Sequence, residues 1–110
     1  MKKIWTLFLL WIMFLSGCGS ESEKYMKLAD QYFAEGQYDY AAYNYVRVLE
    51  TDRNNEKAYL NLIDSYIAQE KTDKALKYIE EAEGKFGEQS LEKKRESLES
   101  MQKEVQSVNF

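Results

Sequence analysis

Apolar residues recur along residues 22–89 at the spacing i, i+3, i+4 and i+7, which places them on one side of an α-helix. This spacing occurs twice, and each time a shorter apolar stripe follows it along the chain. Polar residues fill the positions between, so the pattern predicts four amphipathic helices in two similar pairs. The stripes are Tyr25, Leu28, Ala29 and Tyr32; Ala41, Tyr45 and Val48; Tyr59, Leu62, Ile63 and Tyr66; and Ala75, Ile79 and Ala82.

The two pairs of helices belong to an internal repeat. Residues 22–55 align with residues 56–89 without a gap at an offset of 34, and seven positions are identical. Most of the shared residues fall on the apolar stripes and at the turns, so one structural unit is used twice. The identical pairs are Tyr25/Tyr59, Leu28/Leu62, Asp30/Asp64, Tyr32/Tyr66, Ala34/Ala68, Asp39/Asp73 and Ala41/Ala75.

In these residues the chain resembles the tetratricopeptide repeat, a helix–turn–helix unit of about 34 residues. The first repeat matches at the turn over residues 36–39 and at Tyr45. The second departs at Ile63 and Glu70, where the family usually has a small residue, and at Gly87, where it usually has Pro. The resemblance implies an all-α fold: a helix–turn–helix solenoid of two tetratricopeptide-like repeats plus a C-terminal capping helix.

That capping helix is predicted over residues 90–106, within a terminal region 90–110. Ser90 is a candidate N-cap, and a helix with a polar outer side would close the last repeat, whose apolar stripe would otherwise be exposed. Other helix starts are predicted at Asn54 or Asn55 and at Thr72 or Asp73. The apolar stripe of the capping helix is Leu91, Leu98, Met101 and Val105.

Residues 1–17 have the form of a signal peptide. Two lysines precede an apolar run over residues 4–15, which is shorter than the ~20 residues that span a bilayer. The run ends in the sequence Leu-Ser-Gly-Cys at residues 15–18, which resembles the lipobox of bacterial lipoproteins. The resemblance implies cleavage before Cys18 and attachment of acyl chains such as palmitate to that residue. The alternatives are an ordinary secreted protein and a short membrane anchor with an unrelated Cys.

Residues 18–23 are predicted to hold the lipidated Cys18 and a short flexible tether, because residues 19–23 are small and polar without apolar periodicity. We therefore expect a domain outside the cytoplasm, lipid-anchored to a bacterial membrane. The sequence does not say which membrane that is.

Charge and composition exclude several kinds of function. Without Lys2 and Lys3, 13 basic residues remain against 19 acidic ones, which argues against a nucleic-acid partner. The chain has no His and a single Cys, so zinc sites and Ser-His-Asp triads cannot be built. Asp30 and Asp64 occupy equivalent positions that are expected to face solvent, so they do not suggest an acid–base pair. We expect no enzymatic activity, no cofactor and no metal.

Seven of the nine tyrosines fall into two groups. Those on the apolar stripes are predicted to be core: Tyr25, Tyr32, Tyr45, Tyr59 and Tyr66. By contrast, Tyr40 and Tyr43 lie off the stripe and are candidates for an exposed patch that meets a partner or a second copy of the chain.

The resemblance also implies a concave groove lined by the first helix of each repeat. Its apolar residues and two acids suit a peptide with hydrophobic anchors and a basic residue. The alternative is a groove closed by the C-terminal helix. The candidate partner residues are Met26, Asp30, Phe33, Leu60, Asp64 and Ile67.

These observations predict a membrane-anchored lipoprotein that acts as a protein–protein interaction scaffold or assembly factor at the cell envelope. One alternative is a structural lipoprotein that self-associates as a homo-oligomer without a separate ligand. The other is an accessory subunit of an envelope enzyme.

Overall fold

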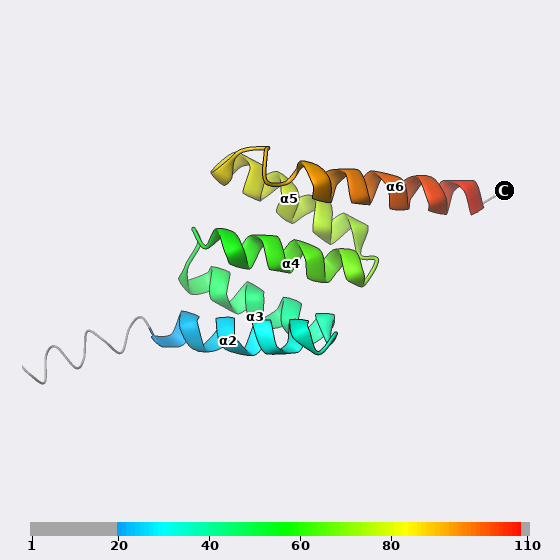
Figure 1. Cartoon of the computed structure of the whole chain (residues 1–110). Helices are drawn as coiled ribbons and strands as arrows, with labels where there is room; N and C mark the ends of the chain where they lie inside the picture. Colours follow the sequence, from blue (N-terminus) through cyan, green and yellow to red (C-terminus); the bar gives the residue numbers. More distant parts are fainter. Residues whose placement is uncertain (1–19, 109–110) are drawn as a thin grey trace, which may run out of the picture.

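The computed structural model describes residues 20–108, and within this range all regular structure is α-helical. Figure 1 shows α2, α4 and α6 in one layer, with α3 and α5 alternating behind them. Each helix packs against the next one along the chain. The predicted solenoid of two helix–turn–helix repeats followed by a C-terminal helix is confirmed. The helices are α2 (Ser20–Ala34), α3 (Tyr38–Thr51), α4 (Glu56–Ala68), α5 (Thr72–Phe86) and α6 (Glu92–Val108).

The core lies between the two layers, where the predicted apolar stripes meet. Alanines on successive helices are completely buried, which lets the helices approach one another closely. Larger side chains fill the remaining space. The largest fully buried ones are Tyr45, Leu62, Ile63, Ile79, Leu91 and Val48.

The turns inside the two repeats close in the same way. The N–H of Gln37 and that of Lys71 each donate to the carbonyl five residues earlier, at 2.9 Å. This way of ending a helix places the residue before the donor in the left-handed region. Gly36 adopts a φ of 76° and Glu70 a φ of 58°. Glu70 therefore holds a conformation that costs a non-glycine residue about 1–2 kcal/mol.

The tether predicted over residues 18–23 is corrected by the structure, because α2 already begins at Ser20. Residues 20–23 form the first turn of this helix. Two glutamates in that turn interact favourably with the positive end of the helix dipole. The predicted signal peptide and the lipid attachment at Cys18 lie outside the described residues.

Side-chain caps were predicted before α4 and before α5, and only the one before α4 is confirmed. The side chain of Asn55 accepts a hydrogen bond from the N–H of Ala58 at 3.1 Å. The cap at Thr72 or Asp73 is wrong, since α5 begins at Thr72 and the preceding Lys71 makes no side-chain cap. The tight turn after α4 sets the start of α5 instead.

The C-terminal helix begins two residues later than predicted, at Glu92 rather than Ser90. Residues 88–91 form turns, and the N–H of Leu91 donates to the carbonyl of Glu88 at 3.1 Å. Leu91 is completely buried just before the helix, so packing of this side chain sets the start of α6 in place of a serine cap.

Candidate functional site

The six residues predicted to contact a partner lie on α2 and α4, at equivalent places in the two repeats. On each helix they follow the spacing i, i+4 and i+7, so they share one side of the helix. All six side chains are half-buried, which leaves part of each available to a ligand. We call this set the α2–α4 face: Met26, Asp30 and Phe33 of α2 with Leu60, Asp64 and Ile67 of α4.

The first acid of this face belongs to a hydrogen-bond network that joins three helices. The hydroxyl of Tyr45 donates to Asp30 Oδ1 at 2.6 Å, and Asn61 Nδ2 donates to the Tyr45 hydroxyl at 3.2 Å. Lys57 Nζ lies 3.5 Å from Asp30 Oδ2. Burial raises the pKa of Tyr45, and its hydrogen bond to Asp30 raises it further. The Tyr45 hydroxyl therefore stays protonated and donates a hydrogen bond to the carboxylate.

The second acid is held by the C-terminal helix. Lys94 Nζ of α6 lies 2.5 Å from Asp64 Oδ1, and the Lys94 side chain is only 20 % exposed. Both acids are thus paired, and their side chains are 38 % and 39 % exposed, so they face solvent only in part. The sequence suggested Lys93, Lys94 or Arg95 of the C-terminal helix as possible contacts of these acids, but it did not indicate Asn61.

The position of α6 bears on whether it closes the predicted groove. In Figure 1, α6 lies beyond α4 and extends the row formed by α2 and α4, rather than crossing over it. It takes the place that the first helix of a third repeat would occupy. The cap therefore borders the α2–α4 face, and it reaches this face through Lys94.

The α2–α4 face offers apolar anchoring sites beside two paired carboxylates. The ring of Phe33 packs edge-on against Tyr38 and Tyr45, with centroids 5.4 and 6.4 Å away, so its orientation is set by neighbouring rings. A basic residue of a ligand would have to replace a lysine at one of the acids. Asp30 is the more accessible choice, because the side chain of its partner Lys57 is 69 % exposed.

A second surface lies on a different side of the first repeat and combines residues of α2 and α3. The rings of Tyr32 and Tyr40 lie 5.3 Å apart. The Arg47 guanidinium lies 5.3 Å from the centre of the Tyr25 ring and 5.7 Å from that of Tyr43. We call this surface the aromatic face: Tyr25, Leu28 and Tyr32 of α2 with Tyr40, Tyr43 and Arg47 of α3.

The tyrosine predictions are confirmed only in part. Tyr45, Tyr59 and Tyr66 are buried, and Tyr40 and Tyr43 are exposed, as expected. However, the two stripe tyrosines of α2 are only half-buried, and Leu28 between them is exposed. The apolar stripe of α2 is therefore not fully inside the core.

Comparison with known proteins decides the family. A family model described as "Tetratricopeptide repeat" matches residues 32–91, which is more than half of the chain. The chain belongs to the tetratricopeptide repeat family. No curated protein and no solved structure matches the chain. Tetratricopeptide repeats generally mediate binding of protein partners and are typically scaffolds rather than catalysts.

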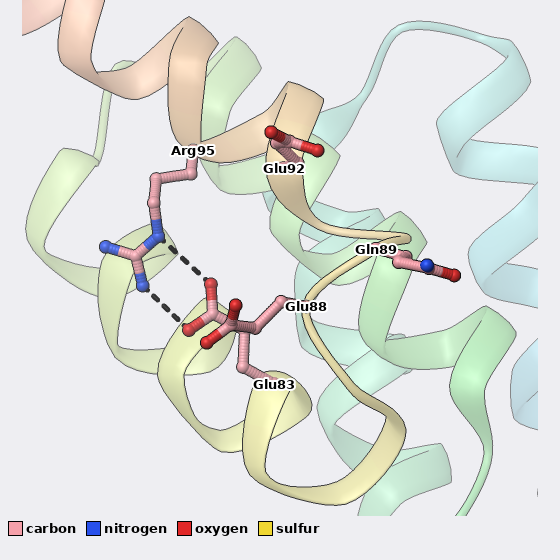
Figure 2. Close-up of a pocket in the computed structure, with 5 residues that line it drawn as sticks. All are labelled: Glu83, Glu88, Gln89, Glu92 and Arg95. Atoms are coloured by element: carbon pink, nitrogen blue, oxygen red, sulfur yellow. Dashed lines mark hydrogen bonds and ion pairs between the residues drawn. The ribbon is translucent and has the colours of Figure 1, made fainter.

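The structure also contains a hollow that the sequence did not predict, at the junction of the last repeat and the cap. Its volume is about 460 Å³. The Arg95 guanidinium of α6 donates two hydrogen bonds to the Glu83 carboxylate of α5, from Nε to Oε1 at 3.0 Å and from Nη2 to Oε2 at 2.8 Å (Figure 2). This pair ties the cap to the second tetratricopeptide repeat. The residues that line the hollow are Glu83, Glu88, Gln89, Glu92 and Arg95.

The described part of the chain lacks two features. Residues 20–108 contain no group of three or more acidic, His or Cys side chains placed to hold a metal ion. Among these same residues, no helix has both the length and the apolar content needed to cross a bilayer.

Proposed function

We propose that this tetratricopeptide repeat protein is a lipid-anchored scaffold or assembly factor that binds a protein partner at the bacterial cell envelope. In this proposal, Cys18 carries the acyl chains and the repeats lie outside the cytoplasm. The basic start, the apolar run over residues 4–15 and the Leu-Ser-Gly-Cys sequence before the repeats support the anchoring.

The observation that carries the scaffold role is the α2–α4 face. Apolar side chains of both repeats lie half-exposed there, beside carboxylates that are paired with Lys57 and Lys94. We expect a partner segment that inserts apolar side chains near Met26, Phe33 and Leu60 and places a Lys or Arg at Asp30. Replacing Lys57 by a partner's cation keeps the charge of Asp30 paired.

Anchoring is tested by fractionating cells that express the wild type or the Cys18→Ala variant. The wild type should be processed and retained with the membrane, whereas the variant should lose lipidation and normal processing. Gly19→Ala serves as a control, because it changes a neighbouring residue but keeps the thiol. If Cys18→Ala is processed and retained like the wild type, the lipoprotein proposal fails.

The partner face is tested by photo-crosslinking in living cells. A crosslinking amino acid is placed at Met26 or Leu60 on the α2–α4 face, or at the exposed Lys77 of α5 as a control. The same partner should be captured from both positions on the face and not from position 77. Identical products from all three positions, or none from the face, would argue against this site. Products made only of two copies of this chain would favour the self-associating alternative.

A further inference from the structure

The aromatic face is the surface that the repeat architecture leaves uncovered. In α4, Tyr59, Leu62 and Tyr66 are 4, 0 and 8 % exposed, because α4 lies between α3 and α5. The equivalent side chains of α2 have no repeat in front of them among the described residues. Leu28, the counterpart of Leu62, is 37 % exposed.

The same face also differs in chemistry from its counterpart in the second repeat. Tyr40 and Tyr43 are 57 and 62 % exposed, and their equivalents 34 positions later are both lysine. Arg47, which lies between two rings of the face, is replaced by Glu81. The first repeat therefore presents exposed aromatic rings and a cation at positions where the second presents ordinary charged residues.

The proposed anchor at Cys18 would bring a membrane close to this face. Only Gly19 separates Cys18 from the start of α2 at Ser20, a reach of at most about 7 Å. The apolar run also ends at Leu15, a few residues earlier. Acyl chains on Cys18, or a retained apolar segment, would both place the bilayer beside the first helix.

We propose that the aromatic face rests on the lipid headgroups of the bilayer that anchors the chain. Tyrosine rings are amphipathic and favour the boundary between headgroups and acyl chains, while Arg keeps its charge among the headgroups. The inference rests on the proposed anchoring and adds an orientation to it. The α2–α4 face, on another side of α2, remains free for a partner.

A second copy of the chain fits this face less well. Two helices of about 15 residues give a surface roughly 22 Å long and 20 Å wide, about half of the ~800 Å² that each partner buries in a standard interface. Contact with the bilayer is intramolecular once the chain is anchored. A small favourable surface is then sufficient, because the anchor supplies a high effective concentration.

The test uses the lipidated protein in vesicles of phosphatidylcholine with phosphatidylglycerol. Because Cys18 is the sole Cys and carries the lipid, Tyr43→Cys offers a single thiol for a nitroxide label. Lys77→Cys, at the equivalent position of the second repeat, is the matched control, and both side chains are exposed. The readout is the collision rate of the label with oxygen, which concentrates in lipid, relative to a water-soluble nickel chelate.

We expect the ratio of oxygen to nickel collisions to be several-fold higher at position 43 than at position 77. Equal ratios in protein that floats with the vesicles would overturn the docking and leave the anchoring intact. Strong dipolar broadening between labels at position 43 would show that a second copy covers the face, and would overturn it too. Protein that does not float with the vesicles would refute the anchoring itself, and this inference with it.

Discussion

The two repeats carry the same three side chains in their first helices, yet these lie in different surroundings. Tyr59, Leu62 and Tyr66 of α4 are part of the core, whereas Tyr25 and Tyr32 of α2 are half-buried and Leu28 is exposed. The residues and their spacing are identical. However, α4 follows α3, whereas α2 is the first helix that the structure describes, so burial in this array depends on the neighbour as much as on the repeat.

The two ends of the array also expose different kinds of side chain. At the C-terminal end, Leu91 just before α6 and Leu98 within it are buried, and most charged residues of α6 are exposed. At the N-terminal end, α2 and α3 present the aromatic face. The end of a solenoid that faces solvent normally carries polar side chains on its outer side. The contrast indicates that the first end has a different environment from the last, which the proposed contact with lipid would supply.

The largest expected difference between the repeats comes from truncating their matched leucines. Leu62→Ala should lower the free energy of unfolding by about 3 kcal/mol, because Leu62 is completely buried. Leu28→Ala should cost less than about 1 kcal/mol, because Leu28 is partly in water already. Urea denaturation of the two variants measures both values. A large cost for Leu28→Ala in solution would mean that another molecule covers the aromatic face.

The next largest effect on stability is expected at Tyr45, which is replaced by Ile79 at the equivalent position of the second repeat. Tyr45→Phe should cost about 1–2 kcal/mol at neutral pH, because Asp30 loses its shortest hydrogen bond. The pKa of Tyr45 is raised above its ordinary value of 10 in the folded protein. The hydroxyl's contribution is therefore complete below pH 10 and is lost as the pH rises through the folded-state pKa.

Stability measured against pH tests this expectation. The free energies of unfolding of the wild type and Tyr45→Phe should converge at alkaline pH. Burial also raises the pKa values of Tyr66 and Tyr78, so the variant should keep part of its alkaline sensitivity. A constant difference between the two proteins up to strongly alkaline pH would contradict the assigned role of the hydroxyl.

A smaller and reciprocal effect is expected at the two turns inside the repeats. Glu70→Gly should stabilise the fold by about 1 kcal/mol, because glycine adopts positive φ without the steric cost. Gly36→Glu should destabilise it by a similar amount. No other atom lies near the position of an added Cβ at Gly36, so the cost comes from the backbone alone. Thermal melts of both variants should shift in opposite directions.

The smallest effect is expected at the ion pair between α4 and the cap. Asp64→Asn should change the free energy of unfolding by less than about 1 kcal/mol, since the Asp64 side chain is 39 % exposed and its pairing with Lys94 is screened by water and salt. The difference from the wild type should shrink further in concentrated salt. A large loss that persists at high salt would mean that Lys94 holds the cap in place.

Much of the fold could be predicted from residue spacing alone. The 34-residue repeat and the stripes placed all four repeat helices, and the polar outer side of the last segment identified the cap. Helix starts were less predictable where packing sets them. Leu91 fixes the start of α6 by being buried, and no pattern of cap residues records that contact.

The candidate site was predictable as a set of positions but not as a set of interactions. The spacing placed Asp30 and Asp64 on one side of their helices, and family resemblance marked that side as a binding surface. Their partners Tyr45, Asn61 and Lys94 lie at different separations along the chain and belong to other helices. Such contacts depend on how the helices cross, which a single repeat pattern does not specify.

The network around Tyr45 has a consequence for how the domain opens. Asp30, Tyr45 and Asn61 belong to α2, α3 and α4, so their hydrogen bonds cross the boundary between the repeats. Neither repeat can separate from the other while these bonds persist. We therefore expect the two repeats to unfold in a single cooperative transition, with amide protons of α3 and α4 exchanging at one common, slow rate.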